Sequence, residues 1–435
     1  MNQTSIFDLL YPKYKITKPI RLIEFFAGYG SQALALKYSS IQFEHWKTCE
    51  WAIKSIQAYK DIHYCEDNED YSKDMNLDQI KNYLYDKGIS ANYNEPMTKE
   101  QVNRLNEKQA RTIYNNIIAT HNLVNIQQVK GSDLEITNTD KYDYILTYSF
   151  PCQDLSLAGK GKGMSDTTTR SGMLWEVERI LTECYELGTL PKICLMENVP
   201  QVHSQDNITD FHKWQNRLEE LGYKNYMQDL IATDYGIPQT RNRCFMVSIL
   251  GDYSYTFPQP IPLKLKLKDL LEDNVDEKYY LSDKQIKDIQ SWNAYEKPLE
   301  NMEKMDKSNI SQTLTTSSGS RCPHCIPIKN KTKKGYLEAE AGDGIDISSR
   351  MEHHRGNVQP QSIQTIDCTG GEGHGVVTPG LRIRKLTPKE CFRLMGVKDE
   401  DYDKCAKNQS NASLYHLAGD SIVVNVLMAI FKEMI

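Results

Sequence analysis

The stretch Arg21-Leu-Ile-Glu-Phe-Phe-Ala-Gly-Tyr-Gly-Ser-Gln-Ala33 joins a short apolar run to a glycine turn and the start of a helical pattern. Gly28 and Gly30 let the backbone turn tightly and approach a ligand closely, and the helix start behind them offers free N–H groups. A strand, a glycine turn and a helix in this order are typical of a Rossmann-like, doubly wound sheet. We therefore expect an α/β fold with a nucleotide-type site after the first strand.

A second strand-like run, residues 43–49, ends at Glu50, about twenty residues beyond the turn, where a carboxylate can hold ribose hydroxyls. Trp51 adds an aromatic face for a purine, although a half-buried structural tryptophan is at least as common. Gly28-x-Gly30-x-x-Ala33 also satisfies the loose dinucleotide fingerprint. A nicotinamide-dependent dehydrogenase is thus one alternative at this point.

Residues 61–125 form an insertion with helical periodicity and a charged opening, which we interpret as a solvated face. The run at residues 124–129 predicts a strand, and Asp133 follows it. An aspartate at a strand end can meet an adenine amine, but a turn carboxylate is an equally good interpretation.

The whole chain has the composition of a globular protein, with 435 residues, a net charge of −6 and 25% charged residues. The length favours two or three domains. Eleven cysteines without regular spacing fit a reducing compartment, and we find neither a secretory signal nor an apolar run of the roughly 18 residues that a membrane helix needs. These features predict a cytoplasmic protein without a membrane partner.

Cys152 follows the apolar run at residues 144–148, so that a thiol stands where a strand stops. The loop Ala158-Gly-Lys-Gly-Lys-Gly163 comes next, and its glycines and two lysines suit a lid over a phosphate-bearing substrate. A cysteine without such a context is usually buried and inert. The position of Cys152 therefore favours a nucleophile only together with its companions.

Two further groups with chemical potential lie at strand ends. Glu197 follows the strand pattern of residues 192–196, and ligands of open α/β sheets bind at the carboxyl ends of strands, so Cys152 and Glu197 can face one pocket. Gln239, Arg241 and Arg243 alternate ahead of the strand pattern at residues 244–250, which aims them to one side of an extended segment.

Taken in order, these motifs resemble the DNA cytosine-5 methyltransferases of bacterial and phage type. The resemblance spans residues 20–430. It is carried by Phe26-Ala-Gly-Tyr-Gly30, Glu50-Trp51, Pro151-Cys-Gln153, Glu197-Asn-Val199, Gln239-x-Arg241-x-Arg243, Arg384-Lys-Leu-Thr-Pro-Lys-Glu-Cys391 and Gly419-Asp-Ser-Ile422.

The resemblance implies transfer of a methyl group from S-adenosylmethionine to C5 of cytosine. It makes Cys152 the nucleophile that adds to C6, and Glu197 the residue that contacts N3 and the exocyclic amine. Arg243 would hold the O2 edge and the thiol sulfur, with Arg241 and Gln239 in the same catalytic set. Because the base is unreachable inside a duplex, the nucleotide must be flipped out.

The same resemblance assigns residues to cofactor and DNA. The cofactor set is Phe26, Gly28, Gly30, Glu50, Trp51, Asp133, Leu174, Asp420 and Ser421. The DNA-contacting set is Gln153, Ser156, Lys160, Lys162, Thr313 and Thr365, the last two as alternatives for the recognition loop. Three positions depart from the family pattern: Ser31 replaces a common Gly, Leu155 a usual Phe, and Asp420 a common Asn, which puts a second carboxylate near the cofactor.

The domain boundaries follow from composition. We expect a catalytic and cofactor-binding domain at residues 1–250 plus 413–435, and a smaller, irregular target-recognition domain at 251–412. Cys322-Pro-His-Cys325 lacks a second paired motif, so we expect no metal.

An RNA cytosine-5 methyltransferase on the same fold is the nearer alternative, and the large segment between Arg243 and Arg384 favours double-stranded DNA instead. The dehydrogenase alternative leaves the Cys152 and Glu197 motifs without roles. We expect a monomer that works with, or protects against, a separately encoded restriction endonuclease.

Overall fold

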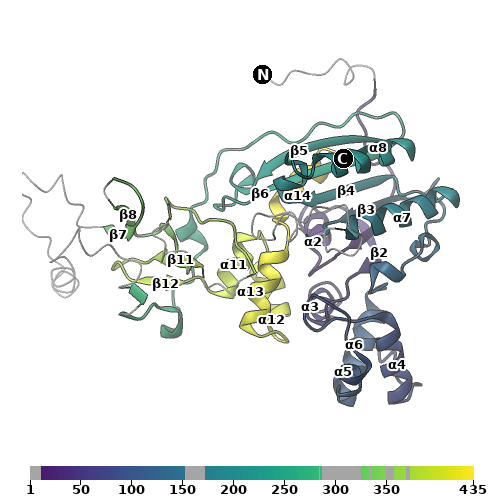
Figure 1. The fold of residues 1–435 in the computed structure, drawn as a ribbon, viewed down its shortest axis with the longest axis horizontal. Coiled ribbons are helices and arrows are strands. Elements are labelled where there is room, and N and C mark those ends of the chain that lie inside the picture. Colours follow the sequence, from purple (N-terminus) through teal and green to yellow (C-terminus); the bar gives the residue numbers. More distant parts are fainter. Residues whose placement is uncertain are drawn as a thin grey trace, which may run out of the picture.

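The computed structural model describes residues 11–151, 172–283, 285–286, 325–333, 335–348, 357–368 and 373–435. A six-stranded sheet in the order β2-β1-β3-β4-β6-β5 forms the centre of the protein (Figure 1). Its strands are β1 (Ile20–Phe25), β2 (Phe43–Cys49), β3 (Asp143–Tyr148), β4 (Ile193–Asn198), β5 (Tyr223–Ile231) and β6 (Asn242–Leu250). The predicted α/β fold is confirmed.

The order of the strands creates one switch point. Strands β1 to β4 are parallel, and β6 is antiparallel to both β4 and β5. The chain leaves β1 toward β2 on one side, whereas β3 and β4 lie on the other. The carboxyl ends of β1 to β4 therefore share an edge with the start of β6, which is where ligands of such sheets bind.

Helices cover both faces of the sheet, each above a separate apolar cluster. One face packs against α2 (Ser31–Tyr38) and α14 (Val424–Lys432), and the other against α7 (Met173–Glu186) and α8 (Ile208–Glu220). The central strands β3 and β4 are buried along their whole length because both faces of the sheet are covered.

The insertion is helical and has a core of its own. It contains α4 (Leu77–Lys87), α5 (Lys99–Asn103) and α6 (Glu107–Ala119), which project below the sheet in Figure 1, and α3 (Ile53–His63) leads into it from β2. Asn76, Thr98 and Asn106 start α4, α5 and α6 with reciprocal capping boxes. The strand predicted at residues 124–129 is wrong: a short 3₁₀ turn (Ile126–Gln128) occupies it, capped by the Asn125 side chain.

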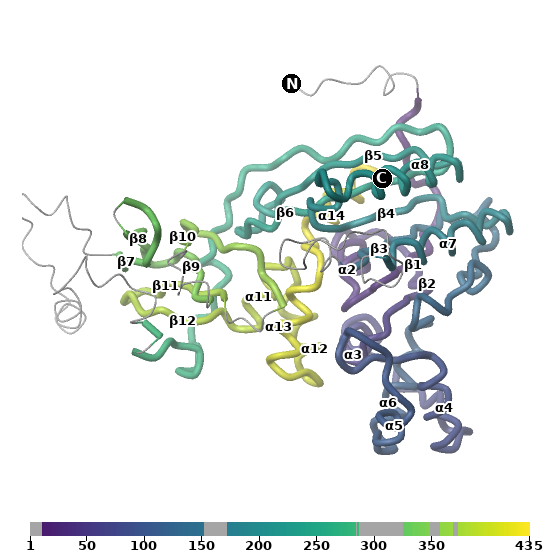
Figure 2. The backbone as a smooth tube through the Cα atoms, in the orientation of Figure 1, coloured from purple at the N-terminus to yellow at the C-terminus, as the bar shows by residue number. Residues whose placement is uncertain are grey.

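Two small antiparallel sheets form a second unit at the left of Figure 1. Their strands are β7 (Cys325–Lys329), β8 (Tyr336–Glu340), β9 (Gly344–Asp346), β10 (Val358–Gln359), β11 (His374–Val377) and β12 (Ile383–Lys385). A small apolar cluster around Ile328, Ile345 and Val377 holds the unit together. After β6 the chain reaches it through a long extended run, which can be followed in Figure 2.

The helices that follow the small sheets pack against the main domain. They are α11 (Pro388–Leu394), α12 (Asp399–Ala406) and α13 (Asn411–Asp420). Phe392 on α11 stacks on Tyr29 of the glycine turn, and Asp401 on α12 pairs with Lys37 of α2 at 2.8 Å. We therefore propose to move the expected domain boundary at residue 412 back to the end of β12.

The span from Asn411 to Lys432 is long and apolar enough to cross a membrane by length and composition, which the sequence did not indicate. Most of it is buried inside the protein, and residues 421–423 interrupt the helix. Packing in the core accounts for its apolar character.

Candidate active site

The glycine turn after β1 has an unusual backbone. Phe26, Gly28 and Gly30 all have positive φ, at 56°, 55° and 83°. The Phe26 N–H donates to the Cys49 carbonyl at 2.8 Å, which joins the turn to the end of β2. Among the described residues, a Cβ built at Gly28 would meet only Ser421 Oγ, at 4.0 Å, so this part of the protein leaves space for a ligand above the residue.

Gly30 has a role in packing the turn against α3. A Cβ at this position would overlap the side chains of His63 and Tyr59, with 2.6 Å to Tyr59 Cε2. The His63 imidazole also lies 2.9 Å from the Tyr29 carbonyl oxygen. The missing side chain of Gly30 thus allows α3 to pack against the turn, and the cofactor contact expected at Gly30 stays a prediction.

Glu50 lies beside the turn. Its carboxylate accepts hydrogen bonds from the Gly28 N–H at 3.0 Å and the Ala52 N–H at 2.8 Å. Desolvation, with a smaller contribution from the charge of Asp420, raises the pKa of Glu50 to about 7 against the lowering effect of those two bonds. A carboxylate aimed at a glycine turn in this way can accept bonds from ligand hydroxyls.

The other residues predicted for the cofactor lie in varied environments. Trp51 is half-buried against the apolar core of the insertion. Leu174 is fully buried on α7, within the core. Asp133 accepts a bond from the Lys130 N–H at 2.9 Å, which is the turn interpretation that the sequence left open. Ser421 lies close to Gly28, directly after Asp420.

The catalytic residues predicted on β4 and β6 do meet. Glu197 Oε1 lies 3.2 Å from Arg243 Nε, and both side chains are largely buried. Burial raises the pKa of Glu197, while the charges of Arg243 and Arg241 oppose that shift. The pair is a carboxyl group with an elevated pKa beside a guanidinium, at the edge of the sheet where β1 to β4 end.

A profile of the family described as C-5 cytosine-specific DNA methylase matches residues 85–435. The chain belongs to this family. The enzyme is therefore a DNA cytosine-5 methyltransferase, as its motifs predicted.

Known relatives of this methyltransferase match along nearly all of its length. The type II methyltransferase M2.ScrFI of Lactococcus lactis subsp. cremoris is 33% identical over 95% of this chain and 99% of its own. The orphan methyltransferase M.SssI of Spiroplasma monobiae is 29% identical over 96% of this chain and 97% of its own. The crystal structure of Dnmt2 methyltransferase from S. pombe shares the fold, with a TM-score of 0.53 and 13% identity over 95% of this chain and 97% of that one.

Gln239 and Arg241 are buried in the methyltransferase and bonded to the main chain of other segments. Gln239 donates to the Leu394 carbonyl at 2.8 Å and accepts from the Ile366 N–H at 3.1 Å. Arg241 donates to the carbonyls of Ile366, Gly419 and Ser421 at 2.9, 3.1 and 2.7 Å. These bonds give both residues an architectural role, and the catalytic role expected for them stays a prediction.

Thr365 lies directly before Ile366, to which Gln239 and Arg241 are bonded. Ile366 is 1% exposed, and the Thr365 carbonyl oxygen lies 2.9 Å from a ring nitrogen of His374. Thr365 itself is half-buried, in a segment that connects the two units of the enzyme. Its contact with DNA stays a prediction.

Several predicted residues lie outside the part of the chain that the structure describes. They are Cys152, Gln153, Ser156, Lys160, Lys162, Thr313 and Cys322. Of the Cys322–Cys325 motif, only Cys325 is described, buried at the start of β7.

Asn198 was assigned no role from the sequence. Its side-chain amide donates to the Phe150 carbonyl at 3.0 Å, and its oxygen accepts from the Val199 N–H at 2.8 Å. Asn198 therefore ties the end of β4 to the segment that leads from β3 to Pro151. Its place in the Glu197-Asn-Val199 motif was the available signal.

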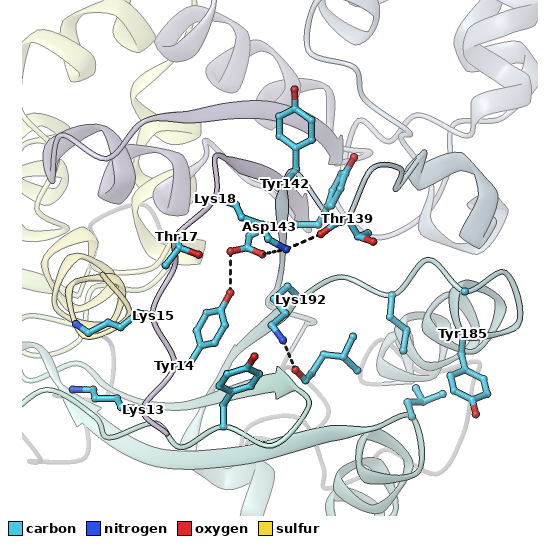
Figure 3. Close-up of a pocket in the computed structure, with 16 residues that line it drawn as sticks. Lys13, Tyr14, Lys15, Thr17, Lys18, Thr139, Tyr142, Asp143, Tyr185 and Lys192 are labelled. Atoms are coloured by element: carbon cyan, nitrogen blue, oxygen red, sulfur yellow. Dashed lines mark hydrogen bonds and ion pairs between the residues drawn. The ribbon is translucent and has the colours of Figure 1, made fainter. Parts of the chain in front are cut away.

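A cavity of about 760 Å³ lies at the opposite edge of the main sheet (Figure 3). Four lysines line it, but their neighbours already engage them: Lys18 donates to the Thr139 carbonyl, Lys192 to the Leu250 carbonyl and Lys15 to the Ile435 carbonyl, and Lys13 pairs with Glu433. The Tyr14 hydroxyl donates to Asp143 at 3.0 Å. This cavity is a junction between the N-terminal segment and the sheet, remote from the strand ends that carry Glu197.

Proposed function

We propose that this methyltransferase takes the methyl group from S-adenosylmethionine and transfers it to a cytosine flipped out of double-stranded DNA. One observation gives this proposal its main support. The glycine turn with Glu50 and the Glu197–Arg243 pair lie at one edge of the sheet, on either side of its switch point. A cofactor and a base bound there would be neighbours.

The residues of the turn fit S-adenosylmethionine. The open space above Gly28 can accept the cofactor, and the Glu50 carboxylate can accept bonds from ribose hydroxyls. Trp51 directly follows Glu50 and offers an aromatic face to the adenine. When bound, the cofactor supplies an electrophilic methyl group.

The chemistry of the base needs a nucleophile, because C5 of cytosine is too weakly nucleophilic to accept a methyl group directly. We assign that role to Cys152 from its place in the sequence. Its thiolate would add to C6 and push electron density to C5. After methylation, loss of the C5 proton and elimination of the thiolate would release 5-methylcytosine and restore the enzyme.

Glu197 and Arg243 would serve the ring during that addition. A protonated Glu197 can donate to N3 and so neutralise the negative charge that develops on the base. Arg243 lies 3.2 Å from Glu197 and would hold the O2 edge. The elevated pKa of Glu197 suits this role, because it keeps a larger share of the carboxyl protonated near neutral pH.

The small sheets and the segment before them would recognise the target sequence. Thr313 and Thr365 are the two candidates for the recognition loop, with Gln153, Ser156, Lys160 and Lys162 as further DNA contacts. We expect a cytoplasmic monomer that belongs to a restriction-modification pair or protects against one.

Cofactor affinity is expected to depend on pH through Glu50. Its pKa is raised to about 7, so the carboxylate that accepts ribose bonds is fully formed only above that value. Calorimetric titration with S-adenosylmethionine should give about fivefold to tenfold tighter binding at about pH 8 than at about pH 6. The pKa of His416 is raised as well, so the pH dependence has two possible sources, and Glu50→Gln distinguishes them. This variant should bind S-adenosylmethionine more weakly and lose most of the pH dependence.

Expression in cells that lack cytosine methylation tests the proposed function as a whole. Genomic DNA digested to nucleosides should contain 5-methylcytosine in cells that express the protein and none in vector controls. Bisulfite sequencing of the same DNA would then identify the target sequence. Purified protein should methylate duplex DNA with labelled S-adenosylmethionine, whereas transfer to RNA alone would overturn the choice of substrate.

A further inference from the structure

A loop of the helical insertion lies against the cofactor segment. Ser90 forms a bridge with Ala52, and its N–H donates to the Trp51 carbonyl at 2.7 Å. The Ile53 N–H returns a bond to the Ser90 carbonyl at 2.9 Å. The Ser90 hydroxyl donates to the Glu95 carbonyl at 2.7 Å, which closes the loop on itself. The loop is therefore anchored directly beyond Glu50.

Tyr93 lies at the tip of that loop in a disfavoured backbone conformation, with φ at 64°. Side chains other than glycine and asparagine rarely adopt this region, and they persist there only when surrounding contacts hold them. The Tyr93 ring stacks on His416 of α13, with 3.9 Å between ring centroids and 16° between planes. The insertion thereby contacts a helix more than 300 residues away in sequence.

His416 in turn holds the residue that stands at the C-terminal end of α13. Its Nδ1 lies 3.0 Å from Oδ2 of Asp420, one helical turn along. Asp420 is followed by Ser421, whose hydroxyl oxygen lies 4.0 Å from a Cβ built at Gly28. Arg241 donates to the carbonyls of Gly419 and Ser421, so both His416 and Arg241 contact this turn.

The charges in this region are coupled. Asp420 is one of the groups that raise the pKa of Glu50. The bond with Asp420 is the main cause that raises the pKa of His416, with Glu50 as a further contributor. Tyr93, from the insertion, also interacts with the charges of Glu50 and Asp420. A protonated His416 would therefore balance two carboxylates that stand near each other.

We propose that Tyr93 and His416 are positioning residues for S-adenosylmethionine: their stack holds Asp420 in place beside the glycine turn and offsets its charge. The inference rests on the proposed cofactor site. It gives the helical insertion a part in cofactor binding. It also accounts for an aspartate at position 420, where the family commonly has asparagine. The carboxylate at position 420 is tolerated because His416 accompanies it.

Calorimetric titration with S-adenosylmethionine at about pH 7 tests the inference. Tyr93→Ala should weaken binding about fivefold, because an aromatic stack contributes a few-fold to tenfold in an equilibrium, and Tyr93→Phe should restore it to within about twofold. His416→Phe keeps the stack but removes the charge, and it should weaken binding about fivefold. Adding Asp420→Asn to His416→Phe should restore the affinity to that of Asp420→Asn alone, because the charge to be offset is gone.

Tyr83→Ala is the matched control, because Tyr83 on α4 packs edge-on against Tyr114 of α6 in the same insertion, 4.9 Å between centroids. This variant should lower the melting temperature like Tyr93→Ala but bind the cofactor like the wild type. In methylation assays Tyr93→Ala should raise KM for S-adenosylmethionine and leave kcat within about twofold.

Three results would overturn the inference. Wild-type affinity in both Tyr93→Ala and His416→Phe would remove the positioning role. Equal weakening by Tyr83→Ala would mean that the insertion acts only through folding. A wild-type protein that binds no S-adenosylmethionine would overturn the proposed function together with this inference, whereas the first two results leave that function intact.

Discussion

Cys152→Ser is expected to lower methyl transfer at least about 10⁴-fold, the largest loss from any single substitution in this enzyme. A serine hydroxyl is hardly ionised near neutral pH, and it is a far weaker nucleophile than a thiolate. Without addition to C6, C5 stays unreactive even when base and cofactor are both bound. Single-turnover assays with labelled S-adenosylmethionine and duplex DNA measure the loss.

The matched control for this substitution is Cys65→Ser. Cys65 is exposed, outside the sheet edge where the site lies, so its loss should leave the rate within about twofold. DNA with 5-fluorocytosine at the target provides a second readout, because fluorine leaves no C5 proton to remove. Wild type and Cys65→Ser should form a complex that survives denaturation, and Cys152→Ser should not. Retention of activity by Cys152→Ser would exclude the covalent mechanism.

The parts of the site that could be predicted from the sequence are those fixed by strand ends. Glu50 and Glu197 lie at or beside the carboxyl ends of strands. Parallel strands bring such ends to one edge, whatever lies between them in sequence. The glycine turn after β1 was also predictable, because a strand followed by two glycines and a helix leaves the backbone few other conformations.

The roles of Gln239 and Arg241 could not be predicted in this way. Their alternation with Arg243 gave a direction for the side chains but said nothing of their partners. Arg241 is bonded to carbonyls at Ile366 and Ser421, 125 and 180 positions away, and main-chain acceptors leave no mark on the sequence. The two side chains thus join the start of β6 to Ile366 in the second unit and to the helices that follow β12.

Other features depended on packing between distant segments. The boundary expected at residue 412 followed composition, but α11 and α12 pack on the main domain through Phe392 and Asp401. The apolar run at residues 124–129 indicated a strand, whereas the Asn125 side chain caps a 3₁₀ turn there. Tyr93 and His416 carried no signal at all, because neither belongs to a motif and their contact joins the insertion to α13.

Replacement of Glu197 by glutamine is the second large effect that we expect, a loss of about 10² to 10³ in kcat. Glutamine keeps the size of the side chain and can still donate from its amide, but it cannot transfer a proton to N3. Glu197→Ala should lose more, because Arg243 would then lie unpaired in a largely buried site. Cofactor affinity should remain within about twofold in both variants, since Glu197 is assigned to the base.

The pH dependence of Glu197→Gln distinguishes proton donation from simple packing. Burial raises the pKa of Glu197, so the protonated donor is present below that pKa and is lost as pH rises through it. Wild-type kcat should therefore fall on the alkaline side, while ionisation of the Cys152 thiol limits it on the acid side. In Glu197→Gln only the acid limb should remain, at a much lower rate. An unchanged alkaline limb in that variant would assign the limb to another group and leave Glu197 as a hydrogen-bonding residue that moves no proton.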